Sequence, residues 1–70
     1  MAYGKVILRD DAGVVITKNA KTLGKAQELA QSWCIYGKGK SIRNADIIRH
    51  RDDRRVMHYW FDGQLQYMRY

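Results

Sequence analysis

Apolar residues near the start of the chain form two short runs that are separated by a polar turn. Val6, Ile7 and Leu8 lie in the first run, within residues 3–9, and residues 14–18 form a second run rich in β-branched side chains. The residues between them, Asp-Asp-Ala-Gly at positions 10–13, are typical of a turn. The pattern predicts an antiparallel hairpin. With Gly13 as a bulge in a three-residue loop, its core face carries Val6, Leu8, Val14 and Ile16.

From residue 22 the apolar spacing changes to steps of three and four residues, which is the period of a helix. Thr22 is a favourable N-cap, and Gly37 is a favourable C-terminal stop. Small residues in the apolar stripe would allow this helix to lie close to a sheet. The stripe consists of Leu23, Ala26, Ala30, Trp33 and Cys34, with Leu29 beside it.

The second half of the chain reads as three further strands, at residues 45–51, 56–61 and 64–70. A charged turn at residues 52–55 separates the first two, and Asp62-Gly63 is a two-residue hairpin signal between the last two. The sequence therefore predicts a single α+β domain over residues 1–70. Its single antiparallel sheet has four to five strands in the order β-β-α-β-β-β, with one helix packed on one face.

The hairpin turns determine which residues of the last three strands share a face. A two-residue turn places Phe61 opposite Gln64, and directly opposed residues point to the same side. An even-length turn near residues 52–53 extends both faces to residues 45–51. We expect the helix to cover the face without arginine, which carries Ile48, Met57, Tyr59, Phe61 and Met68, with Tyr70 at its end. The other face carries Ile47, Val56, His58, Trp60, Leu65 and Tyr67, with Arg49, Arg51, Arg54 and Arg69 among them. A single odd-length turn would exchange the faces, so the reverse assignment stays open.

The charge balance favours an anionic partner. Thirteen lysines and arginines against seven acids give a formal net charge of +6. Such a charge suits nucleic acid or an acidic protein surface, although solubility alone also explains it. Cys34 is the single cysteine, which fits a reducing cytoplasm. No apolar run approaches the ~20 residues needed to span a membrane, and the first residues do not read as a signal peptide.

The motifs that would carry catalysis are incomplete. Gly39-Lys40-Ser41 imitates the end of a phosphate-binding loop, but Cys34 stands where its first glycine belongs. His50 and His58 are expected on opposite sides of the sheet, so a metal site with Asp46 or Asp52 is not indicated. We expect no enzyme activity, no cofactor and no metal.

Rings and arginines interleave in residues 43–70, which indicates a binding surface. We predict that Arg49, Arg54, Trp60, Tyr67 and Arg69 form one exposed face that contacts the partner. Lys38 and Lys40 of the basic loop are further candidates for partner contact, and with the basic helix they are what remains for binding if both faces of the sheet are covered. Such a face suits base stacking with phosphate contact, and it equally suits a protein interface. In the alternative interpretation, Trp60 belongs to the core and the arginines surround its edge.

Two segments resemble small bacteriophage-encoded inhibitors, notably anti-CRISPR proteins and phage inhibitors of host RNA polymerase. They are Thr22-Leu23-Gly24-Lys25-Ala26, continuing to Ala30, and Trp60-Phe61-Asp62-Gly63. We expect a non-enzymatic protein, monomeric or homodimeric, in the cytoplasm, which is the host cytoplasm if the protein is phage-encoded. The resemblance implies a compact domain that acts by occlusion. It would dock on a host protein or ribonucleoprotein complex that handles nucleic acid, such as a CRISPR effector, and inhibit it. The alternative is a basic domain that contacts DNA or RNA directly.

Overall fold

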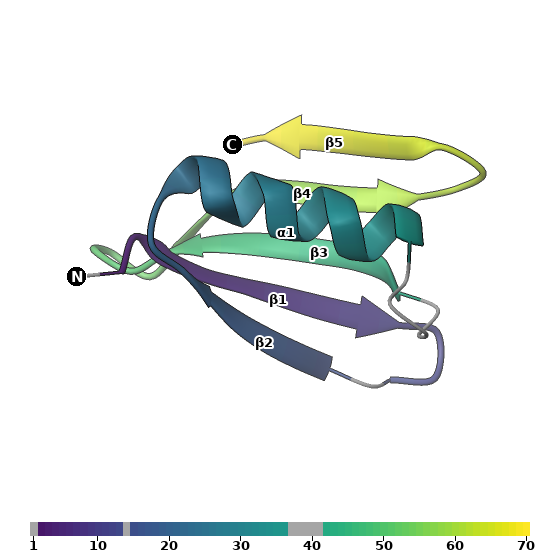
Figure 1. Ribbon diagram of the computed structural model, residues 1–70, viewed down its shortest axis with the longest axis horizontal. Helices are drawn as coiled ribbons and strands as arrows, with labels where there is room; N and C mark the ends of the chain where they lie inside the picture. The colour runs from purple at the N-terminus through teal and green to yellow at the C-terminus, as the bar shows by residue number, and fades with distance from the viewer. Residues whose placement is uncertain (1, 14, 37–41) are drawn as a thin grey trace.

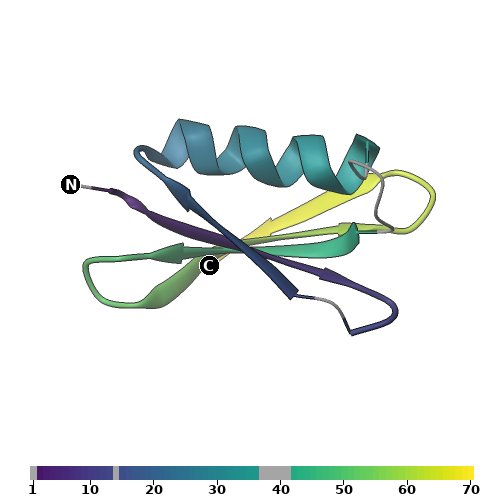
Figure 2. The same ribbon diagram turned by 60° about the horizontal axis from the view of Figure 1, so that its bottom comes forward.

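The computed structural model describes residues 2–13, 15–36 and 42–70. The elements in chain order are β1 (Gly4–Asp10), β2 (Val15–Ala20), α1 (Leu23–Tyr36), β3 (Ile42–Arg49), β4 (Arg54–Phe61) and β5 (Leu65–Arg69). The five strands form one antiparallel sheet in the order β2-β1-β3-β4-β5. Figures 1 and 2 show α1 lying across one face of this sheet. The predicted fold class is confirmed.

The first hairpin forms as its sequence predicts. Gly13 takes a left-handed conformation (φ 86°), and its N–H donates to the carbonyl of Asp10. The register places Leu8 opposite Ile16, and Val6 lies two residues earlier on the same face. Val6, Leu8 and Ile16 therefore share one side of the sheet, as expected, whereas Val14 lies outside the described residues.

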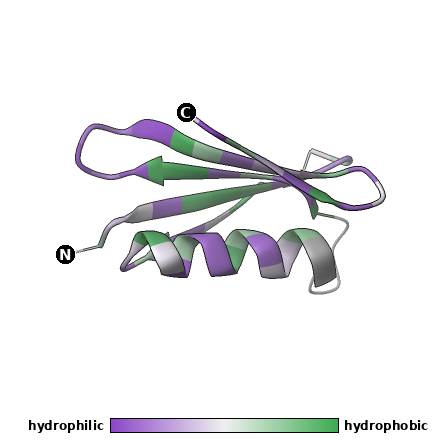
Figure 3. Ribbon diagram, turned by 90° about the horizontal axis from the view of Figure 1, so that it is seen from above, coloured by the Kyte–Doolittle hydropathy of each residue, from purple (hydrophilic) through white to green (hydrophobic). Residues whose placement is uncertain are grey.

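Helix α1 begins at its predicted cap. The hydroxyl of Thr22 accepts a hydrogen bond from the N–H of Lys25 (3.1 Å), which satisfies one of the free donors of the first turn. Figure 3 shows hydrophobic and hydrophilic residues alternating along the turns of α1. Ala26 and Ala30 are fully buried against the sheet, whereas Leu23 at the start of the helix is 37% exposed and is therefore not part of the buried core predicted for the stripe. Among the described residues, no helix is long and apolar enough to cross a bilayer.

The core lies between α1 and the central strands. Leu8, Ile47 and Val6 are the largest fully buried side chains. Leu29 and Trp33 of the helix pack against this cluster but are only partly buried. The other buried apolar residues are Ala20, Ala26, Ala30, Cys34, Ile42, Ala45, Met57 and Tyr59.

Strand β5 is turned over relative to the prediction. Phe61 pairs with Leu65, which leaves a three-residue loop at residues 62–64 in place of the expected two. Gly63 has positive φ (98°), and the N–H of Asp62 donates to the carbonyl of Gln64. The odd loop moves every residue of β5 to the opposite face, so that the helix side receives Leu65, Tyr67 and Arg69.

A β-bulge changes the register between β3 and β4. The turn at residues 50–53 has an even length, and Ile48 pairs with Arg55, but Ile47 pairs with Met57. Val56 is the extra residue, and beyond it the alternation is reversed. The bulge brings Ile47 under the helix and turns Ile48 away. The predicted placement of Ile48 under the helix is therefore wrong, and that of Met68 is wrong because of the odd loop before β5. Met57 and Tyr59 are buried under the helix as predicted, with Phe61 on the same side.

Candidate functional site

The face of the sheet opposite α1 is the open face, because α1 packs on the other side (Figure 2). Its residues follow from the strand registers. They are Lys5, Ile7 and Arg9 of β1, Val15, Thr17 and Asn19 of β2, Asn44, Asp46 and Ile48 of β3, Arg55, His58 and Trp60 of β4, and Gln66 and Met68 of β5.

A buried carboxylate lies at the centre of the open face. Asp46 is only 5% exposed, and it is the buried charged residue of the described chain. Its neighbours in β3, Ala45 and Ile47, point into the core on the opposite side. A charge in this position requires compensating partners, because desolvation penalises an isolated ion.

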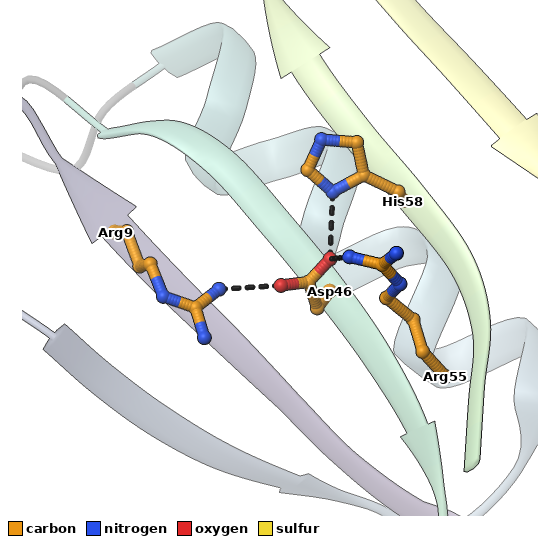
Figure 4. Close-up of polar contacts among 4 residues, drawn as sticks. All are labelled: Arg9, Asp46, Arg55 and His58. Atoms are coloured by element: carbon orange, nitrogen blue, oxygen red, sulfur yellow. Dashed lines mark hydrogen bonds and ion pairs between the residues drawn. The ribbon is translucent and has the colours of Figure 1, made fainter.

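Three side chains from the neighbouring strands supply that compensation (Figure 4). Arg9 of β1 forms an ion pair with one carboxylate oxygen of Asp46. On β4, Nδ1 of His58 lies 2.6 Å from the other oxygen, Oδ1, and Nη1 of Arg55 lies 3.4 Å from it. The register explains the arrangement, since His58 directly opposes Asp46 and Arg9 pairs with the residue two positions away, Asn44.

These contacts keep Asp46 ionised. Burial raises the pKa of its carboxyl, but the hydrogen bonds and charges of His58 and Arg9 outweigh burial and lower that pKa below its usual value. Because an ionised carboxylate only accepts hydrogen bonds, Nδ1 of His58 is the donor. The other ring nitrogen of His58 points away from Asp46 (Figure 4).

The partners of Asp46 also hold aromatic rings. His58 stacks on Trp60, with ring centroids 5.6 Å apart and an interplanar angle of 18°. The guanidinium carbon of Arg55 lies 4.4 Å from the ring centroid of Tyr70. Asp46 therefore orients two groups, the His58–Trp60 stack and the Arg55–Tyr70 cation–π pair, on one surface.

The open face remains positively charged in spite of Asp46. Lys5, Arg9 and Arg55 are the cations among its described residues, and Asp46 is the acid. The side chains of Arg9 and Arg55 are 43% and 46% exposed. Each guanidinium thus keeps donors that can reach a ligand from a fixed position.

The predicted site residues do not share one face. Trp60 lies on the open face, as expected, but Tyr67 opposes Tyr59 on the helix side. Arg69 opposes Met57 on that same side, and Arg49 opposes Arg54 at the end of the β3–β4 ladder. The prediction of a single surface is wrong because of the odd loop and the bulge described above. Lys38 and Lys40 lie outside the described residues. Partner contact by these residues stays a prediction.

Sequence reasoning missed Arg9 and Arg55 and considered Asp46 only as a metal ligand. One signal was present: Asp46 interrupts the apolar run Ala45-Asp46-Ile47-Ile48, and an acid inside a central strand needs cationic partners on the adjacent strands. Which cations these are depends on the register, which the sequence pattern did not determine.

Other chemistry is not assembled in the described part of the chain. His50 is exposed in the turn after β3, away from His58, and no group of three or more metal-ligating side chains occurs among the described residues. Burial raises the pKa of the Cys34 thiol to about 11, which disfavours its use as a nucleophile. Comparison with protein-family models, curated proteins and solved structures found no significant match.

Proposed function

We propose that this protein is a non-enzymatic domain that binds single-stranded nucleic acid on the open face of its sheet. One observation carries the proposal: a stacked His58–Trp60 pair lies beside exposed arginines on a sheet face that α1 leaves uncovered. Bases of a single strand stack on aromatic rings, and arginines pair with phosphates.

In this proposal each group has a separate task. A base stacks on Trp60, which is partly exposed beside His58. Arg9 and Arg55 contact the phosphates that flank this base, because both guanidinium groups are nearly half-exposed and both contact the carboxylate that also holds His58. Asp46 takes no part in ligand contact, since its side chain is 8% exposed, and it acts by holding Arg9, Arg55 and His58 in position.

The affinity for a fluorescein-labelled oligothymidylate, measured by anisotropy, tests the proposal. Trp60→Ala should weaken binding by roughly 5- to 150-fold, because a stacked base contributes about 1–3 kcal/mol. Arg55→Gln and Arg9→Gln should each weaken binding and reduce the slope of log K against log salt by about 0.7, as expected for one lost phosphate contact on a single strand.

A matched control separates this site from general electrostatics. Lys25→Gln removes the same charge from the exposed side of α1, where Lys25 pairs with Glu28 at 3.7 Å. This variant should bind within about twofold of the parent protein, since exposed charges at a distance are screened. Equal losses in Lys25→Gln and Arg55→Gln would show that only net charge attracts the oligonucleotide and would contradict the proposal.

A second candidate follows from the edge of the sheet. Tyr67, Met68 and Tyr70 on or next to edge strand β5 are 62%, 49% and 60% exposed. Exposed rings beside arginines are typical of protein-interface hot spots, so docking on a host nucleic-acid-handling complex, as the phage inhibitors do, is the alternative. In that case a nuclease-resistant complex from bacterial lysate should be lost in Tyr67→Ala and Met68→Ala but retained in Trp60→Ala.

A further inference from the structure

A second basic site lies at one end of the sheet, away from the centre of the open face. A pocket of about 470 Å³ opens between the start of β1 and the turn that follows β3, two segments that lie at the same end of the molecule in Figure 1. This volume lies within the range of small-molecule sites. Its lining residues are Ala2, Tyr3, Arg49, His50 and Arg51.

The backbone holds the two walls of this pocket together. The N–H of His50 donates to the carbonyl of Tyr3 (2.9 Å), and the N–H of Tyr3 donates to the carbonyl of Lys21 (3.1 Å). Gly4 makes this close approach possible, because a Cβ at position 4 would collide with the carbonyl oxygen of Ile48. The pocket is therefore built on paired strands and fixed by the sheet.

Residues 49–54 at this end of the sheet contain three arginines and two acids, so the segment carries a net positive charge. Nε and one terminal nitrogen of Arg49 donate to the carboxylate of Asp52, at 3.0 and 2.6 Å, which fixes this guanidinium. Arg54 directly opposes Arg49 in the ladder, and the carboxylate of Asp52 beside them offsets this like-charge pair. Arg51 is exposed and makes no hydrogen bond or ion pair within the described residues.

Tyr3 adds a ring and a hydroxyl to the same pocket. Its side chain is partly buried and packs against the core cluster, so its position is fixed. Tyr3 and Arg49 both line the pocket. The neighbouring hollow, lined by Ala2, Asn19, Ala20 and Lys21, has a single cation and no ring, so it lacks this combination.

We propose that the pocket between Tyr3 and Arg51 binds a phosphate monoester, the end group of a free nucleotide or of a phosphorylated nucleic-acid strand. The fixed guanidinium of Arg49 and the exposed guanidinium of Arg51 supply planar donors for the phosphate oxygens. The ring of Tyr3 supplies an apolar surface for the attached nucleoside. Only the nucleic-acid source of this phosphate rests on the function proposed above.

Two titrations test this site and separate the two sources of phosphate. In the first, AMP or adenosine is added to ¹⁵N-labelled protein, and the amide resonances of Tyr3, His50 and Arg51 are followed. AMP should shift them saturably, whereas adenosine at the same concentration should not. In the second, oligothymidylate with a 5′-phosphate, a 3′-phosphate or neither is compared by anisotropy.

Arg51→Gln should weaken AMP binding roughly tenfold, as expected for the loss of a charge-assisted hydrogen bond. Arg43→Gln is the matched control, because Arg43 pairs with Asp11 near the opposite end of β3 and should leave AMP binding within about twofold. A preference for one phosphorylated end would identify a nucleic-acid terminus as the source. AMP binding without such a preference would identify a free nucleotide.

Two results would overturn the proposal. One is that AMP shifts these resonances no more than adenosine does and that neither end phosphate changes affinity. The other is that Arg43→Gln loses as much affinity as Arg51→Gln, which would reflect net charge alone. If AMP binds but no oligonucleotide does, the pocket stands and the proposed nucleic-acid function fails.

Discussion

The buried carboxylate of Asp46 should make a large contribution to stability, and Asp46→Asn tests this directly. The substitution keeps the shape of the side chain but removes its charge. Asparagine also presents an NH₂ group to cationic donors where the carboxylate presented an acceptor. Arg9, Arg55 and His58 then lose the group that holds them, and one polar group of residue 46 stays buried without a matching partner.

The expected loss is about 2–3 kcal/mol. A hydrogen bond to a charged group contributes about 1.5–3 kcal/mol, and the His58 contact, the most enclosed of the three, belongs in this range. The two arginine pairs add less, because their guanidinium groups are nearly half-exposed and solvent screens them. In a 70-residue domain each kcal/mol lowers Tm by roughly 4–8 °C, so Tm should fall by roughly 10–20 °C.

Urea unfolding followed by circular dichroism over a range of pH provides the assay. The folded-state pKa of Asp46 is lowered, so its stabilising effect is present above the unfolded value of about 3.9 and is lost as pH falls through the folded pKa. The difference in unfolding free energy between parent and variant should be full at neutral pH. It should shrink below about pH 4.

One control variant and two possible results test whether the charge of Asp46 stabilises the fold. Asp11→Asn breaks an ion pair with Arg43 in which both side chains are more than half exposed, so it should cost at most about 1 kcal/mol. Equal stability of Asp46→Asn and the parent at pH 7 would refute the reasoning, because the cluster would then contribute nothing net. A loss that is the same at pH 7 and at pH 2 would also refute it, because it would not depend on the charge of Asp46.

Three further substitutions test the local structure, each by denaturant unfolding. Gly4→Ala should cost about 1–3 kcal/mol or more, since the new methyl group collides with the carbonyl of Ile48, and an unchanged midpoint would show that β1 and β3 are not so close. Thr22→Ala should cost about 0.5–2 kcal/mol through loss of the N-cap hydrogen bond, whereas Thr22→Ser should recover most of it. Ala30→Leu should cost about 1–3 kcal/mol because Ala30 of α1 is fully buried between the helix and the sheet, and a stabilised variant would contradict the close packing of α1 on the sheet.

Local patterns predicted the elements of this fold. The Thr22 cap, the alanine stripe of α1 and the turn at Gly13 are short-range features, and the structure contains each of them. The order of strands and helix followed from the spacing of apolar residues. This spacing is two residues in the first strands, three to four residues in the helix, and two residues again in the last strands.

Local sequence patterns did not predict which residues of the last three strands share a face. Asp62-Gly63 indicated a two-residue turn, but the loop has three residues, and nothing in the sequence around Val56 marked it as a bulge. Each of these differences of one residue reverses a strand. The prediction therefore placed Tyr67 and Arg69 on the wrong face of the sheet. Trp60 lies between the bulge and the turn, and its predicted place on the face opposite Tyr59 is correct.

The site was not predicted for the same reason, since the strand register determines which residues meet. Its members come from β1, β3 and β4, and only the sheet order places β1 next to β3. Arg9 and Asp46 are separated by 37 positions in the chain, so no short motif joins them. The sequence did indicate a basic surface with interleaved rings, and the open face has that chemistry with a partly different set of residues.

The central claim is that single-stranded nucleic acid occupies the open face. Mapping an oligothymidylate on ¹⁵N-labelled protein by NMR tests it most directly. Binding on the open face should give saturable shifts at the indole N–H of Trp60 and at the amides of Arg55 and His58, while Lys25 and Glu28 on the exposed side of α1 stay unchanged. Shifts that centre on α1, or the absence of any saturable shift on the open face, would contradict it.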